Sequence, residues 1–551
     1  MSEISKNKNK NSLINEKIRK DIYGKIKNNN SINKYLFNEH IIIKGKHEKL
    51  SKSIKQNNLI QSKSITKIAF FLKLLIFINL YFNKVSSNQE IIIKIRFKES
   101  DKDYKILNHK YSKCPSNIYI YDENDSILSS LTFSTNCDYS DTIISQDGYS
   151  LFYKFISTST PKIYKFKFSW NINDEQISFK ELFKDCINIE FVDLALLTTE
   201  GITDMESMFE GCTNLSIVNT TNLKTSNVVS MKSMFKSCVS LTALDVSKFD
   251  TSKVNNMETM FSNCQKIRVL DISNFKVEKV TSMRAVFEYC SSLTTLNLYE
   301  FMTIRVTDMS FMFYECSNLK SIDVSSFKIH KVEDMSFMFY GCKSLTSATL
   351  FTTLSSIAIN MKSAFQGCTS LKLLNLYKSN TLPVGNMNKM FYNCNSLTSL
   401  NLTRFTTTNV TDMRAMFYGC SSLKSLIIGN FKTYLLEDME YMFAKCSSLN
   451  YLDLHNFYTK KVKNMRYMFY GCFSLTSIKI DNDNFDTSNV YYMEYMFYNC
   501  SSLTSIKINN LKTTNVLSME YMFFNCSSLT VSDFLSKFDT SSVTSMAHMF
   551  S

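Results

Sequence analysis

VTDMSFMFYECSNLKSIDVSSFKI, residues 306–329, and VTDMRAMFYGCSSLKSLIIGNFKT, residues 410–433, are two copies of a segment that recurs through most of this 551-residue chain. Twelve cysteines mark the copies at a spacing of 26 residues, from Cys186 to Cys472, and Cys500 and Cys526 continue the series after a slip of two residues. A fixed repeat of this length is typical of a solenoid, in which each coil packs against its neighbours.

One copy also predicts what a coil contains. A short helix is predicted first, because four apolar residues follow a cap residue, Thr307 or Asp308, with the spacing of one helical face: Met309, Met312, Phe313 and Cys316. A short strand follows, in which Ile322 and Val324 face inward and Asp323 faces outward. We therefore predict an α/β fold, a solenoid of about 14 coils that resembles leucine-rich repeats.

A narrower resemblance rests on FDTSNVYYMEYMFYNCSSLTSIKI, residues 485–508. This segment is similar to the 26-residue repeat of BspA-type leucine-rich repeat surface proteins, and the match covers residues 179–551. The resemblance implies a protein that is displayed on a surface and binds or adheres without catalysis. It supplies no catalytic residue.

The front of the chain differs from the repeats. Residues 1–67 hold 16 Lys and Arg against 5 Asp and Glu, so they carry most of the net charge of +14. Their Lys/Asn-rich composition predicts a disordered head. Because the repeats are close to neutral, nucleic acid is not a predicted partner.

Residues 68–82, IAFFLKLLIFINLYF, form a hydrophobic segment of 15 residues. Three interpretations remain open: the core of a signal peptide that is cleaved, a signal-anchor that keeps the protein on a membrane, or a buried apolar segment. The first two interpretations place the repeats at the cell surface or outside the cell. The protein would then be secreted or would be a single-pass membrane protein.

Two boundaries complete the predicted organisation. Residues 90–178 contain several strand-like segments separated by polar turns, which predicts a small β-rich cap for a solenoid over 179–551. The last repeat stops at Ser551 before its cysteine position, so we expect the solenoid to be truncated at the C-terminus.

The cysteine column is the first candidate site. Equivalent cysteines in stacked coils lie close enough for disulfides, but their side chains run in parallel, which favours buried thiols as a structural core column. The column comprises Cys186, Cys212, Cys238, Cys264, Cys290, Cys316, Cys342, Cys368, Cys394, Cys420, Cys446, Cys472, Cys500 and Cys526. Cys114 and Cys137, in the β-rich region, are candidates for a disulfide if that region is exported.

Other recurring residues favour structural roles. The methionines recur with the coil and are expected in the core, although they could instead line an adaptable groove. The aspartates Asp204, Asp308 and Asp412 fit helix caps better than a calcium site, because further carboxylates are lacking beside them. No metal site, cofactor or enzymatic activity is predicted, since no nucleophile, base or phosphate-binding loop stands out.

The outward residue of each predicted strand is the candidate binding face. We call these positions the strand row, and they are Asp245, Asp271, Asn297, Asp323, Asn401, Asp453, Lys479 and Lys507. The row changes from acidic to basic along the chain, so it is either a solvated surface or a contact surface for a protein or glycan ligand on another cell or matrix. The predicted function is non-enzymatic surface adhesion or ligand binding, and the alternative is an intracellular protein-interaction scaffold.

Overall fold

The computed structural model describes the chain from Gln89 to Ser551, with gaps. The residues outside the description are 1–88, 98–101, 109–116, 123–124, 126, 133–142, 146–149, 156–161, 171–177, 198–200, 351–354, 377–381, 481–483, 506–511 and 531–537. The predicted head, the hydrophobic segment 68–82, Cys114, Cys137 and Lys507 all lie outside the described residues.

Seven strands precede the repeats. They are β1 (Gln89–Phe97), β2 (Lys102–Asn108), β3 (Asn117–Tyr121), β4 (Ile127–Thr132), β5 (Ile143–Ser145), β6 (Ser150–Phe155) and β7 (Lys162–Trp170). Inward isoleucines alternate along β1, where Ile91, Ile93 and Ile95 are fully buried. β1 is therefore a strand with one buried face.

The remaining strands are short and belong to the coils. They are β8 (Ile189–Asp193), β9 (Ile217–Asn219), β10 (Ala243–Leu244), β11 (Ser321–Asp323), β12 (Ser347–Thr349), β13 (Ile359–Asn360), β14 (Leu373–Asn375), β15 (Leu382–Asn386), β16 (Ser399–Asn401), β17 (Phe405–Thr406), β18 (Ser425–Ile427), β19 (Tyr451–Asp453) and β20 (Ser477–Lys479). Neighbouring coil strands pair in parallel, as in β11 with β12 and β19 with β20.

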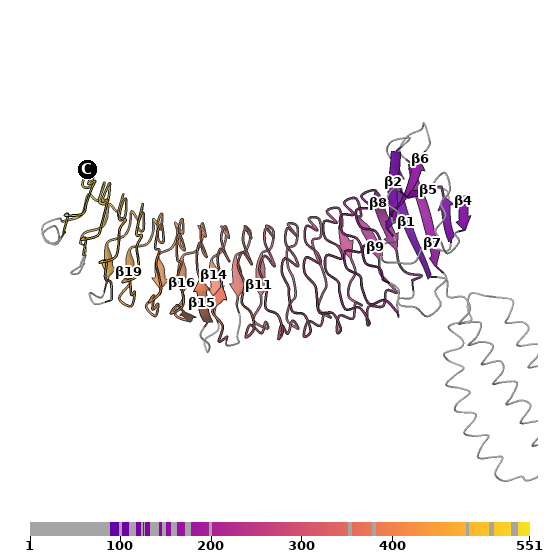
Figure 1. The fold of residues 1–551 in the computed structure, drawn as a ribbon, viewed down its shortest axis with the longest axis horizontal. Helices are drawn as coiled ribbons and strands as arrows, with labels where there is room; N and C mark the ends of the chain where they lie inside the picture. Colours follow the sequence, from indigo (N-terminus) through magenta and orange to yellow (C-terminus); the bar gives the residue numbers. More distant parts are fainter. Residues whose placement is uncertain are drawn as a thin grey trace, which may run out of the picture. The chain divides into compact units, whose positions relative to one another are not determined.

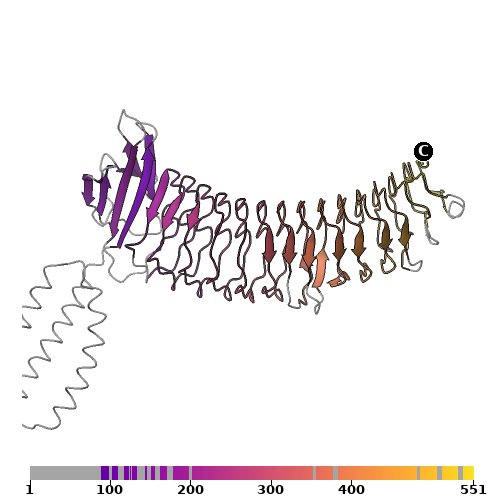
Figure 2. The same cartoon turned by 180° about the vertical axis from the view of Figure 1, so that it is seen from behind.

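Four of the N-terminal strands join the solenoid through one sheet with the order β10-β9-β8-β1-β7-β3-β4, whereas β2, β6 and β5 form a separate three-stranded sheet. Within it β1 pairs antiparallel with both β7 and β8, and β8 is the strand of the first coil. Figures 1 and 2 show β8 and β9 beside these strands and the later coils stacked in one row beyond them. The pairing with β1 covers the edge of β8 that would otherwise expose unpaired backbone groups.

The prediction of an α/β fold is wrong, because the structure contains no helix among the residues it describes. The chain is a strand-based β-solenoid. Where the helix was predicted, the backbone amides alternate between two kinds of hydrogen bond. One amide donates to a carbonyl of its own coil, and the following amide donates to a carbonyl of the next coil. Met312 donates to the carbonyl of Met309 at 3.3 Å, whereas Phe313 donates to the carbonyl of Met338, 25 residues further along, at 2.8 Å.

The backbone angles explain why a helix does not form. Phe311 and Glu315 have φ values of 60° and 54°, in the left-handed region that interrupts a right-handed helix. Equivalent left-handed residues stand five residues and one residue before each cysteine from Cys186 to Cys526. Consecutive turns therefore place the four apolar residues on the inner side, and they direct every second amide to the next coil.

The core consists of columns that run from coil to coil. The phenylalanine three residues before each cysteine stacks on its equivalent in the next coil, and Phe313 lies 5.5 Å from Phe287 and 5.4 Å from Phe339 between ring centroids. The methionines of the repeat, such as Met309 and Met312, are fully buried beside these rings. Each buried ring contributes about 1.5–3 kcal/mol by leaving water, so the columns supply most of the stabilisation that one coil cannot supply alone.

Candidate functional site

The strand row occupies one outward position per coil. Asp323, Asn401, Asp453 and Lys479 end coil strands, whereas Asp245 directly follows β10, and Asp271 and Asn297 lie in coils whose described residues form no strand. Asp245, Asp271, Asn297, Asp323, Asn401 and Lys479 are exposed, and Asp453 is half-buried. The residue before each of them points inward, and Ile322 of β11 is only 4% exposed. This alternation holds the row at one position per coil, as expected for a strand with one buried face.

The acidic members of the row also bond to their own turns. One carboxylate oxygen of Asp323 accepts the backbone N–H of Ser325 at 2.9 Å, and Asp245 accepts both the N–H and the hydroxyl of Ser247 at 3.0 and 2.6 Å. Asp and Asn favour this short-range arrangement because the side chain replaces a backbone acceptor.

These hydrogen bonds also set the charge of the row. The hydroxyl and then the backbone N–H of Ser247 hold the pKa of Asp245 below its ordinary value, and Ser273 does the same for Asp271. Hydrogen bonds to a carboxylate favour its ionised form. The early coils therefore present negative charge at neutral pH.

Lys479, at the basic end of the strand row, forms an ion pair with Asp453, an acidic member of the same row. Nζ of Lys479 lies 3.1 Å from Oδ2 of Asp453, and Nδ1 of His455 lies 2.7 Å from Oδ1 of the same carboxylate. Burial raises the pKa of Asp453, but the hydrogen bonds from His455 and Lys479 outweigh it, so that the pKa is lowered overall. Lys479 therefore belongs to an ion-paired cluster rather than to an isolated basic patch.

A second outward row was missed in the sequence. It consists of the first residue of eight coil strands, two positions before the strand row or its equivalent in that coil: Ala243, Ser321, Ser347, Leu373, Ser399, Ser425, Tyr451 and Ser477. Leu373 and Tyr451 are 52% and 47% exposed. The signal was available, because residues i and i+2 of a strand share a face. The strand face thus offers two residues per coil, mostly hydroxyls beside carboxylates and amides.

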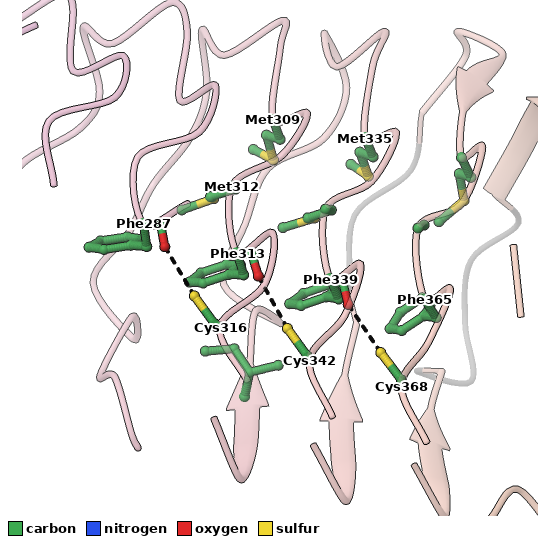
Figure 3. Close-up of a cluster of buried hydrophobic side chains, with 14 of the residues drawn as sticks. Phe287, Met309, Met312, Phe313, Cys316, Met335, Phe339, Cys342, Phe365 and Cys368 are labelled. Atoms are coloured by element: carbon green, nitrogen blue, oxygen red, sulfur yellow. Dashed lines mark hydrogen bonds between the residues drawn. The ribbon is translucent and has the colours of Figure 1, made fainter. Parts of the chain in front are cut away.

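The cysteines form a ladder of thiols that bond to backbone. Sγ of Cys316 donates to the carbonyl oxygen of Phe287 at 3.0 Å, and Cys342 donates to Phe313 at 3.2 Å (Figure 3). The same bond, at 2.9–3.2 Å, recurs from Cys212 to Cys526, and all cysteines of the column are free thiols. Each thiol therefore satisfies a phenylalanine carbonyl of the preceding coil.

Burial makes these thiols unreactive. It raises the pKa of Cys290, Cys420 and Cys472 to about 12, and that of Cys526, which is only partly buried, to about 11. The thiolate is the form that attacks disulfides or binds metals. The column therefore acts as packing and hydrogen bonding at neutral pH.

The aspartates predicted as helix caps bind turns instead. Oδ1 of Asp204, Asp308 and Asp412 accepts the backbone N–H two residues later, at 2.9, 2.8 and 2.9 Å. The capping bond was correctly anticipated, but the element that it begins is a chain of turns.

Among the described residues, no three His, Cys, Asp or Glu side chains gather as ligands for a metal ion. In the same part of the chain, no helix has the length and apolar character needed to cross a membrane.

The repeats match a known family. The model of the family described as Mycoplasma protein of unknown function, DUF285, matches residues 177–269, 261–375, 385–503 and 473–551. The chain belongs to the DUF285 family. No curated protein matches it.

Among solved structures, the chain is similar to one described as the functional domain of InlJ from Listeria monocytogenes, which includes a cysteine ladder. The identity is 12% and the TM-score is 0.17. The match covers 58% of this chain and 66% of that domain.

Proposed function

We propose that this DUF285 solenoid is a non-enzymatic binding protein of the BspA type, displayed at the cell surface for adhesion or ligand binding. The observation that carries the proposal is the contrast between the two sides of each coil strand. The inward positions hold an apolar residue in nearly every coil, whereas the strand row varies among Asp, Asn and Lys, and the second row holds Ser at five of its eight positions and Ala, Leu or Tyr at the others. A surface that varies on a constant scaffold is how repeat proteins form extended binding faces.

The charge of the strand row supports a contact role for the early coils. Asp245, Asp271 and Asp323 are exposed carboxylates that project from successive parts of the same face. Serine hydroxyls beside them can donate or accept hydrogen bonds. This arrangement suits a partner with exposed hydroxyl, amide or basic groups, as on a glycan or a protein.

The first test removes only charge. In Asp245→Asn/Asp271→Asn/Asp323→Asn, the amide oxygen can still accept the turn N–H, so we expect the fold to persist. Retention of the full-length protein on surfaces coated with extracellular-matrix proteins or mucin should fall about tenfold, because charge complementarity at an interface typically contributes that much or more.

The matched control is Asp250→Asn/Asp486→Asn/Asp539→Asn. These aspartates make the same turn bond, to Ser252, Ser488 and Ser541, but do not belong to the strand row. Equal retention of both triple variants and the unchanged protein would contradict a binding role for the strand row.

The second test addresses location. Cells that express the full-length gene are treated with protease while intact, and released peptides are identified by mass spectrometry. Peptides from 186–551 support surface display. Protection until the cells are lysed would contradict it and favour an intracellular protein-interaction scaffold.

A further inference from the structure

A second surface lies on the turn segments rather than on the strands. We call it the tyrosine strip, and it consists of Tyr441, Tyr467, Tyr495 and Tyr521 in one row and Tyr470, Tyr498 and Phe524 in a parallel row. The centroids of successive rings in the first row are 4.5, 4.7 and 4.8 Å apart, with interplanar angles of 10° or less. All seven side chains are half-buried.

The fold does not require aromatic residues at these positions. In the early coils the first row is occupied by Ser207, Ser233, Thr259 and Ala285, with the same left-handed backbone. The buried phenylalanine column runs through early and late coils alike, so the core is complete without the strip. Bulky side chains at left-handed positions are costly where serine suffices, which points to a role beyond packing.

Stacking determines which part of each ring is available. Because successive rings cover one another's faces, each tyrosine offers its edge and hydroxyl. The aromatic edge carries partial positive charge, and the hydroxyl both donates and accepts. Burial raises the pKa of Tyr441 to about 12, so this hydroxyl stays protonated at neutral pH. The strip therefore suits oxygen-rich partners better than flat apolar ones.

The charged residues beside the strip argue against a polyanion. The residue before each tyrosine of the first row is Glu440, Arg466, Glu494 or Glu520. Arg466 binds Glu494 through Nε and Nη2, both at 2.8 Å, which neutralises the arginine of this group. Of the remaining glutamates, Glu520 already accepts the hydroxyl of Ser545 through Oε1 at 2.6 Å. Its other oxygen and the carboxylate of Glu440 can accept hydroxyl groups, and both negative charges would repel phosphate or sulfate.

We propose that the tyrosine strip binds a neutral polysaccharide laid along the stack of coils. A sugar unit of an extended glycan is about as long as the spacing between the rings, so successive units can meet successive hydroxyls and carboxylates. A polypeptide strand has no such match, because its side chains alternate between two faces. The inference rests on the proposed function only in treating the chain as a binding protein, since the strip and the strand row are different surfaces.

The test is electrophoresis of the full-length protein in native gels that contain a soluble neutral polysaccharide. The probes are laminarin, hydroxyethylcellulose and yeast mannan, with heparin as the anionic comparison and gelatin as the polypeptide comparison. We expect at least one neutral polysaccharide to retard the protein and heparin not to. Tyr441→Phe/Tyr467→Phe/Tyr495→Phe/Tyr521→Phe keeps the stacked rings and removes four hydroxyls, so the dissociation constant should rise about tenfold or more.

The matched control removes four hydroxyls elsewhere, in Tyr289→Phe/Tyr299→Phe/Tyr434→Phe/Tyr458→Phe, and should bind as the unchanged protein does. The inference is overturned if no neutral polysaccharide retards the protein, if the strip variant binds as tightly as the control, or if gelatin or heparin is the probe whose binding the strip variant loses. Retention through the strand row can persist in each of these cases, so the proposed function fails or holds separately.

Discussion

Two residues in every coil adopt a left-handed backbone, yet glycine occupies only one of these positions and only in some coils. Gly211, Gly341, Gly367, Gly419 and Gly471 stand directly before a cysteine with φ between 69° and 77°. Asparagine, aspartate, glutamate, serine, lysine or tyrosine occupies the same place in other coils. The neighbouring coils hold these side chains in place, because each left-handed residue donates its N–H to the next coil.

Gly367 isolates the cost of this backbone. A Cβ atom added there would meet Cα of Gly341 at 3.6 Å, which is an ordinary contact, so Gly367→Ala introduces backbone strain without a clash. We expect the free energy of unfolding to fall by about 1–2 kcal/mol. Urea unfolding followed by circular dichroism measures the change.

Gly201→Ala is the comparison for that substitution, because no heavy atom lies within 4 Å of its added Cβ and its φ is not left-handed. This variant should be close to neutral or slightly more stable. Equal stabilities for the two alanine variants would show that the turn before the cysteine tolerates a side chain without strain.

At the scale of the coil, one face of the early coils carries a ladder of alternating charges. In the early coils, the residue six positions before each cysteine alternates in sign through Lys180, Glu206, Lys232, Glu258 and Arg284. Lys180 pairs with Glu206 at 3.3 Å, and Lys232 pairs with Glu258 at 2.9 Å. Because the sign alternates, each charge can pair with the opposite charge of the neighbouring coil, whereas it would be repelled by the equivalent residue two coils away. The charges therefore favour the stacking of each coil on its own neighbour.

Glu258→Lys reverses one member of this ladder and places it between Lys232 and Arg284. Because these side chains are partly exposed, we expect a loss of only about 1 kcal/mol in stability at low salt. In 1 M salt the loss should shrink, since exposed charges are screened. Urea midpoints at the two salt concentrations measure both effects.

The same charge reversal at exposed Glu278, in the returning segment of a coil, serves as its control. A loss of equal size in both variants, or one that salt does not reduce, would contradict pairing through the ladder.

The coil also shows what the sequence could and could not predict. The period, the inward Ile322 and Val324 and the outward Asp323 follow from spacing alone, and the structure has them. The helix was wrong because a spacing of three, one and three suits both a helical face and a chain of turns. Glycine or asparagine before many of the cysteines was the turn signal that distinguishes them, since both residues favour left-handed backbone.

The two candidate surfaces also differ in how far the sequence could predict them. The strand row was predictable because alternation along a strand is a local property. The tyrosine strip depends on which residues of different coils stack, and it also depends on turns that replace the helix. The recurrence of these tyrosines with the repeat was visible in the sequence, at Tyr441, Tyr467, Tyr495 and Tyr521. The sequence did not show that their side chains reach the surface.

For the whole molecule, the column of buried cysteines makes the free energy of unfolding depend on pH. Thirteen cysteines of the ladder are buried and free. Their thiols remain protonated in the folded chain, where the pKa of Cys290, Cys420 and Cys472 is about 12, whereas an unfolded thiol ionises near pH 8.5. Below that pH both states are protonated and the contribution to stability is complete.

Above that pH, the unfolded chain releases protons that the folded chain retains. The stability therefore falls as pH rises through the interval from about 8.5 to 12, by up to about 1.4 kcal/mol per pH unit for each buried thiol. Tyr314 and Tyr441, whose pKa burial raises to about 12, act in the same direction above pH 10. We expect the protein to unfold in alkali over a narrow range of pH, because several thiols of one ladder titrate together on unfolding.

Cys290→Ala/Cys420→Ala/Cys472→Ala separates the thiols from the tyrosines. Urea unfolding at pH 7 gives the cost of the lost packing, and the same measurement between pH 9 and 10, below most tyrosine ionisation, gives the slope. Removing three titrating thiols should reduce the slope by up to about 4 kcal/mol per pH unit. An unchanged slope would mean that the ladder is not what alkali titrates, and the loss of stability would then have to come from groups on the outside of the coils.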